Sequence, residues 1–224
     1  MKRTFITDNQ IETQRRLYSQ PILIGNHIAI KILNSRNRHF GIIDNCKIDD
    51  KITICIDPGY AFGDGTHPTT KMCVENIEKY ITSGDTILDI GCGCGILSIA
   101  ALCLGAEKAD GVDISAEAVK VSLNNAKLNN VENKFSPIVG NLTDNIVGCY
   151  DIVVANLLSD PLIQLLETLQ RFIHNRSTVI ISGIHENREQ DVRQAIDKNF
   201  IVVEQHSRDG WICYVLKPNS VESE

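Results

Sequence analysis

The pattern of apolar and polar positions divides the chain into an amino-terminal part with short apolar runs and a longer part with regular alternation. Residues 1–20 are polar and lack clear periodicity, and we interpret them as an arm or a short helix. The apolar runs that follow span residues 28–30, 40–43 and 52–56, and each is bounded by Asn, Asp or Gly. Such runs are typical of strands, so this part predicts a small β segment.

Helix-like and strand-like patterns alternate from residue 68 onward. The predicted helices span residues 68–80, 96–104, 116–128, 161–173 and a stretch that ends near 198. The predicted strands span residues 86–90, 109–113, 135–139, 152–155, 178–182, 200–206 and 211–216. Such alternation is typical of a parallel sheet, whereas the short link at 207–210 fits only an antiparallel hairpin.

Together these elements predict an α/β fold. We expect a doubly wound, Rossmann-like sheet of seven strands that ends in a C-terminal antiparallel hairpin, with the small β segment before it. We divide the chain into residues 1–51, which hold the arm and the β segment, residues 52–217, which form the main domain, and a tail at 218–224.

The composition is that of an ordinary globular protein, with 43% hydrophobic residues, 22% charged residues and a formal charge of -6 over 224 residues. No run approaches 18 apolar residues and the first residues lack the apolar core of a signal peptide, so we expect a cytoplasmic protein without membrane contact. Nine basic and five acidic side chains precede residue 52, against thirteen and twenty-three from there on. An acidic main domain does not favour nucleic-acid binding.

The eight cysteines do not indicate a disulfide framework, because a chain of this length has core enough and carries no export signal. Cys92 and Cys94 form a Cys-x-Cys pair, but metal sites usually space paired ligands more widely. We therefore expect neither redox chemistry nor a metal site at this pair.

A glycine-rich turn at residues 88–95 lies between a predicted strand and a predicted helix, where backbone N–H groups can face a ligand. The dinucleotide fingerprint would need glycine at Ile96, and no Lys or Arg lies in the turn. Asp89, two residues before Gly91, would repel a pyrophosphate. The turn therefore favours a cofactor with a positively charged end over a dinucleotide.

Asp113 ends the next predicted strand, 22 residues after Gly91. A carboxylate in that position can accept hydrogen bonds from both ribose hydroxyls of an adenosine. The alternative is that Asp113 only caps the following helix. Combined with the glycine turn, Asp113 favours S-adenosylmethionine, whose sulfonium and ammonium groups are cationic.

Three stretches carry a resemblance to a known family: residues 57–70 (DPGYAFGDGTHPTT), the turn at 88–95 and residues 154–158 (VANLL). They resemble the catalytic domain of the PrmA family, whose members trimethylate amines of a large-subunit ribosomal protein. The first motif is long, and the spacing fits across residues 52–216. The resemblance implies a class I methyltransferase sheet in residues 52–217 and S-adenosyl-L-methionine as the methyl donor.

The resemblance also implies a set of residues that line the cofactor site: Phe62, Gly63, Thr66, Thr70, Gly91, Asp113 and Asn156. To these we add Asp89, Gly93 and Ile114, which belong to the glycine turn and the strand end.

Family members usually carry a separate N-terminal domain that recognises the substrate, whereas only about fifty residues precede Asp57 here. We therefore expect an N-methyltransferase for a small or peptide-sized amine, enclosed by the N-terminal segment as a lid. The alternative is a protein methyltransferase for a lysine or N-terminal amine of a ribosomal protein. A noncatalytic S-adenosylmethionine binder remains a third hypothesis.

Two predicted catalytic residues belong to these motifs. The carbonyl oxygen of Asn156 can orient the acceptor amine, unless Asn156 only ends a strand. His67 can relay a proton or line the pocket, unless it only caps the helix that begins at Pro68. Trp211, the only tryptophan, could offer its face to a cationic substrate, although core packing is the more common role.

Overall fold

The computed structural model describes residues 20–33, 48, 50–59, 61 and 63–219. The predicted apolar run at 40–43, nearly all of the arm and most of the tail lie outside these residues, as does Phe62.

A three-stranded sheet forms the amino-terminal part. It consists of β1 (Ile22–Ile24), β2 (Ile28–Ile32) and β3 (Ile52–Ile56), in that spatial order. β1 runs antiparallel to β2, whereas β3 runs parallel to it. The predicted small β segment is thus present, and the strand at 52–56, which we assigned to the main domain, pairs within it. The domain boundary after residue 51 stays a prediction.

A seven-stranded sheet forms the rest of the molecule. Its strands are β4 (Thr86–Ile90), β5 (Lys108–Asp113), β6 (Phe135–Val139), β7 (Tyr150–Asn156), β8 (Ile173–His185), β9 (Phe200–Arg208) and β10 (Trp211–Pro218). Their spatial order is β6-β5-β4-β7-β8-β10-β9. The first five are parallel, and β10 is antiparallel to both β8 and β9, which confirms the predicted doubly wound sheet with its terminal hairpin.

The strand order reverses at β4, because the chain first builds outward to β6 and then returns to add β7 on the other side of β4. Open α/β sheets bind ligands outside the carboxyl ends of the strands at such a switch point. The glycine turn follows β4 directly, so the topology puts it at that crevice.

Five helices belong to the described part of the chain: α2 (Pro68–Tyr80), α3 (Ile96–Cys103), α4 (Ala116–Leu128), α5 (Ser159–Thr168) and α6 (Glu189–Ile196). Short 3-10 turns occur at η1 (Glu132–Lys134), η2 (Leu169–Phe172) and η3 (Glu186–Arg188). None of these helices has the length and apolarity needed to cross a bilayer.

The predicted helix 161–173 is wrong at its carboxyl end. Helix α5 gives way to the 3-10 turn at Leu169, and β8 begins at Ile173. Leu169, Phe172 and Ile173 are nevertheless all buried, so the apolar spacing continued past the end of the helix. The spacing of the apolar residues therefore predicted correctly which residues are buried, but not where the helix ends.

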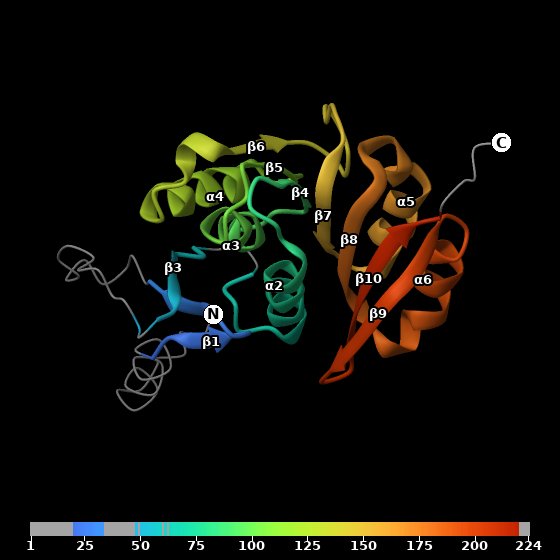
Figure 1. The fold of residues 1–224 in the computed structure, drawn as a ribbon, viewed down its shortest axis with the longest axis horizontal. Coiled ribbons are helices and arrows are strands. Elements are labelled where there is room, and N and C mark those ends of the chain that lie inside the picture. Colours follow the sequence, from blue (N-terminus) through green and yellow to red (C-terminus); the bar gives the residue numbers. More distant parts are fainter. Residues whose placement is uncertain (1–19, 34–47, 49, 60, 62, 220–224) are drawn as a thin grey trace, which may run out of the picture.

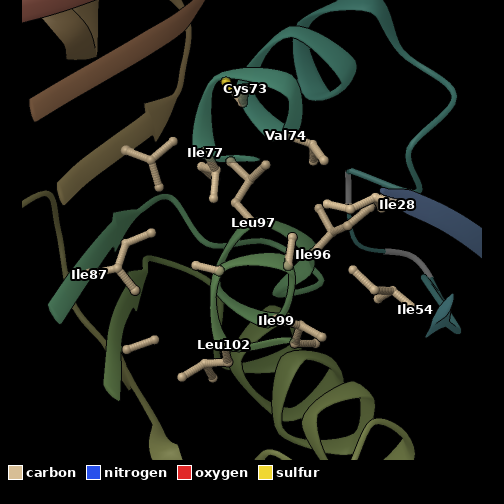
Figure 2. Packing of buried hydrophobic residues seen from close by; sticks show 14 of the residues in the cluster. Ile28, Ile54, Cys73, Val74, Ile77, Ile87, Ile96, Leu97, Ile99 and Leu102 are labelled. Carbon is tan, nitrogen blue, oxygen red and sulfur yellow. The ribbon is translucent and has the colours of Figure 1, made fainter. Parts of the chain in front are cut away.

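The helices cover both faces of the large sheet (Figure 1). Alternate strand residues point to opposite sides: Ile87 packs in the core that includes α2 and α3, and Leu88 packs in the core that includes α5 and α6. Figure 2 shows Ile28 and Ile54 of the small sheet beside Ile96 and Ile99 of α3. The small sheet therefore shares one hydrophobic core with the layer that carries the glycine turn.

Candidate active site

A cavity of about 590 Å³ lies at the carboxyl edge of the large sheet, around the ends of β4, β5 and β7. Its volume falls within the range of roughly 300–1,000 Å³ that is typical of small-molecule sites. Seven of the predicted site residues line it, from four separate segments of the chain: Gly63, His67, Thr70, Gly91, Gly93, Asp113 and Asn156.

Four predicted residues are not among those that line the cavity. Phe62 lies outside the described residues. Thr66 is exposed, and both its N–H and its hydroxyl hydrogen-bond to Asp64. Ile114 follows the end of β5 and is 76% exposed, and Asp89 is completely buried behind the glycine turn. Their contact with a cofactor stays a prediction.

Two glycines make room for Leu157, which also lines the cavity. Gly91 has φ 75°, and a Cβ there would lie 2.3 Å from the Cδ2 atom of Leu157. Gly183, at φ 87°, would place a Cβ 2.2 Å from the carbonyl oxygen of Leu157, which is backbone and cannot move aside cheaply. Gly183 is a site residue that the sequence reasoning missed.

The carboxylate of Asp113 is fixed by two backbone amides. Its Oδ2 accepts from the N–H of Gly93 at 2.9 Å, and its Oδ1 accepts from the N–H of Ser115 at 2.9 Å. The side chain that caps α4 is Ser115, whose hydroxyl oxygen accepts from the N–H of Ala118 at 3.3 Å. Asp113 is thus not the side-chain cap of α4. Its remaining lone pairs are available to a ligand at the cavity wall.

The side chain of Asp89 hydrogen-bonds to the first turn of helix α3. Its Oδ2 accepts from the backbone N–H of Ser98 at 3.2 Å and from the Ser98 hydroxyl at 2.7 Å. Gly95, the N-cap residue of α3, has no side chain to do this. Burial raises the pKa of Asp89 to about 7, against the lowering effect of the Ser98 hydrogen bonds, and the charge of Asp113 adds to the rise.

Asn156 ends β7 on the opposite side of β4 from Asp113. Its Nδ2 group donates to the hydroxyl oxygen of Thr70 at 3.4 Å, and Thr70 is buried in the first turn of α2. This contact orients the amide with Oδ1 as the remaining acceptor. Thr70 therefore contacts Asn156 as well as lining the cavity.

His67 is both a helix cap and a lining residue. Its Nδ1 accepts from the N–H of Thr69 at 3.4 Å, which caps α2, and the same ring borders the cavity. Trp211 lines the cavity beside it, with ring centroids 5.0 Å apart in an edge-on arrangement, and also packs against the core. A second edge-on contact, at 5.3 Å, joins Trp211 to His185. The rings of His67 and Trp211 thus form part of the cavity wall.

The ionisable lining of the cavity favours a cation. Asp113 and Glu117 both line it, whereas no Lys or Arg is among its described lining residues. The thiols of Cys92 and Cys94 are buried in the turn, and burial raises the pKa of Cys94 to about 12. Nowhere in the described ranges do three or more His, Cys, Asp or Glu side chains form a group able to hold a metal ion.

The strand order, the helices on both faces and a glycine-lined cavity at the switch point define a class I methyltransferase fold, as predicted. Within that class, the chain belongs to the ribosomal protein L11 methyltransferase (PrmA) family, whose model matches residues 1–219.

Relatives with known names agree with this family. A ribosomal protein L11 methyltransferase from Dictyoglomus thermophilum is 41% identical over 201 residues, which are 89% of this chain and 63% of that protein. The enzyme of the same name from Bacillus licheniformis is 37% identical over 169 residues, or 75% of this chain and 54% of that protein. The chain thus spans little more than half of these relatives.

A solved structure aligns with most of this chain. The ribosomal protein L11 methylase of Lactobacillus delbrueckii subsp. bulgaricus aligns with a TM-score of 0.78 at 29% identity, covering 89% of this chain and 99% of that one. An RNA methyltransferase from Salinibacter ruber, solved with S-adenosyl-L-homocysteine, aligns with a TM-score of 0.55 at 19% identity over 70% of this chain and 98% of that one. The second likeness concerns the fold alone.

Proposed function

We propose that this protein is an S-adenosylmethionine-dependent methyltransferase that methylates an amine of ribosomal protein L11. The observation that carries the proposal is the cavity with Asp113 and Asn156 on either side of the glycine turn, in a chain of the PrmA family. From the sequence we favoured a small or peptide-sized amine, with a ribosomal protein as the alternative. The names of the relatives support the alternative better, and we adopt it.

The residues present fit S-adenosylmethionine. The cavity is large enough, and its carboxylates suit a ligand with a cationic sulfonium and ammonium. In this proposal Asp113 accepts hydrogen bonds from the ribose hydroxyls, while the backbone of Gly91 and Gly93 lies against the ligand. Ile114 is proposed to cover the adenine with its exposed side chain.

When bound, the cofactor supplies an electrophilic methyl group on a cationic sulfur. The chain's own contribution is positioning, because a displacement at carbon needs the nitrogen in line with the bond that breaks. We propose that Asn156 Oδ1 accepts an N–H of the acceptor amine, so that the nitrogen lone pair faces the methyl carbon, and that Thr70 fixes the Asn156 amide for this task.

The acceptor amine must reach the cavity without its extra proton. The His67 Nδ1 lone pair is taken by the Thr69 N–H, so a neutral ring carries its proton on Nε2 and has no nitrogen left to accept another. We therefore propose that the amine loses its proton to solvent before it binds and that His67 lines the pocket. The edge-on stack on Trp211 holds the His67 ring in a fixed orientation. Trp211 itself can stabilise an ammonium by about 1 kcal/mol through its ring face. The proposed compartment is the cytoplasm, where ribosomal proteins are made.

The test is to incubate the protein with S-adenosylmethionine and purified ribosomal protein L11, and in parallel with a panel of small amines, and to weigh the products by mass spectrometry. We expect methyl groups on L11 and none on the panel. Methylation confined to the small amines would instead support our first hypothesis, an N-methyltransferase for a small or peptide-sized amine. Cofactor binding without transfer to any acceptor would leave the noncatalytic binder.

A further inference from the structure

Asn125 of α4 and Asn129, the C-cap residue of the same helix, hydrogen-bond to the edge of β3 that faces away from β2 and to the residue that follows β3. The Asn129 carboxamide accepts from the N–H of Cys55 at 2.8 Å and donates to its carbonyl oxygen at 2.7 Å. One helical turn earlier, the Asn125 carboxamide accepts from the N–H of Asp57 at 2.9 Å and donates to its carbonyl oxygen at 3.2 Å. Each side-chain amide therefore pairs with the backbone as a neighbouring strand would.

Only Asn125 also reaches the glycine turn. Its Nδ2 group donates a second hydrogen bond, at 2.9 Å, to the carbonyl oxygen of Cys94. The corresponding second bond of Asn129 stays within its own helix, on the carbonyl oxygen of Asn125. The glycine turn also contacts the segment that follows β3 directly, because the Cys94 thiol donates to the carbonyl oxygen of Gly63 at 3.2 Å.

Asn125 thus joins two neighbouring segments that both line the cavity. One contains Gly93 and the rest of the glycine turn, and the other follows β3 and contributes Ala61 and Gly63. Asn125 is completely buried, its hydrogen bond to Cys94 is buried and its two bonds to Asp57 are partly buried. Breaking bonds of this kind leaves buried backbone groups without partners, which costs more than an exposed bond is worth.

We propose that Asn125 is a positioning residue of the cofactor site: it fixes the glycine turn relative to the segment after β3, and thereby the shape of the cavity that both segments line. This inference rests on the proposed function, since the shape of the cavity matters for an S-adenosyl ligand. It assigns Asn125 no contact with that ligand. Through Asn125, the affinity of the cofactor site should depend on the position of the segment after β3, and ligand binding should stabilise that segment.

The experiment measures the dissociation constant of S-adenosyl-L-homocysteine by calorimetry, well below the unfolding temperature of every variant. We expect Asn125→Ala to weaken binding about tenfold or more. Asn129→Ala is the matched variant, because it removes the same kind of strand-like pair and touches no cavity segment, and it should weaken binding less than about threefold. Asn124→Ala, an exposed neighbour on α4, should bind as the wild type does.

Hydrogen exchange on the wild-type protein keeps the proposal testable if Asn125→Ala does not fold. If Asn125 couples the cofactor site to the segment after β3, ligand binding must in turn stabilise the hydrogen bond of that segment to Asn125. Bound S-adenosyl-L-homocysteine should therefore slow exchange at the Asp57 amide, which donates to Asn125, more than at the amides of β1. Unchanged exchange at Asp57, or equal affinity losses in Asn125→Ala and Asn129→Ala, would overturn the proposal. Absence of binding by the wild type would instead contradict the proposed function.

Discussion

Replacing Asp113 by alanine tests the cofactor site most directly. The carboxylate spends two lone pairs on the amides of Gly93 and Ser115 and keeps the others for a ligand. A hydrogen bond to a charged group contributes about 1.5 to 3 kcal/mol net. When the carboxylate is removed, the ribose hydroxyls that donate to Asp113 hydrogen-bond to water instead, which recovers part of that free energy. We expect a total loss of about 2 to 3 kcal/mol, or roughly 30- to 150-fold in the dissociation constant.

Calorimetry with S-adenosyl-L-homocysteine measures this loss. Asp113→Asn keeps one acceptor oxygen and removes the charge, so its dissociation constant should lie between those of the wild type and Asp113→Ala. Glu107→Ala is the matched control, since this exposed acid precedes the other end of the same strand. An Asp113→Ala variant that folds and binds with wild-type affinity would refute the assignment of Asp113 to the ribose.

Three further predictions concern other side chains of the site. Asn156→Ala should lower kcat about 10- to 100-fold in steady-state assays with little change in the affinity for S-adenosyl-L-homocysteine, and normal turnover would leave Asn156 only a structural role. Cys92→Ser and Cys94→Ser should keep most activity, and elemental analysis should find no stoichiometric zinc that either change releases. Burial raises the pKa of Asp89 to about 7, above roughly 3.9 in an unfolded chain, so its contribution to stability is full below pH 4 and is lost as pH rises to 7. Urea titrations should therefore show the stability of the wild type falling across that window, by up to about 4 kcal/mol, relative to Asp89→Asn, and parallel pH profiles would contradict this.

The sequence predicted the large sheet well because each element carried its own local signal. Helix 116–128 begins after Ser115, a good N-cap, and the structure has the same bounds. Helix 68–80 likewise begins at Pro68, which suits the first position of a helix. Strand β8 was predicted too short at both ends: Ile173 was assigned to the preceding helix, His174 to Ser177 are polar and carry no strand pattern, and residues 183–185 were left out.

The site could be predicted where a residue follows a strand end, and less well where its orientation matters. Asp113 and Asn156 both end parallel strands, so the topology alone brings them to one edge. Asp89 lies inside β4 between Leu88 and Ile90, which both face the core under α5. Alternation along the strand therefore points Asp89 to the opposite side, under α3, and this signal was available but unused.

The contacts of Asn125 show why part of the site was beyond sequence reasoning. Helical spacing puts Asn125 and Asn129 on one face of α4, but on an isolated helix two asparagines four residues apart indicate an exposed face as readily as a buried one. Their partners, Asp57 and Cys55, lie 68 and 74 residues away, on a strand whose pairing with β2 is itself nonlocal. No local pattern encodes such a contact. The residue that we propose to fix the shape of the cavity became recognisable only once the fold had brought β3, α4 and the glycine turn together.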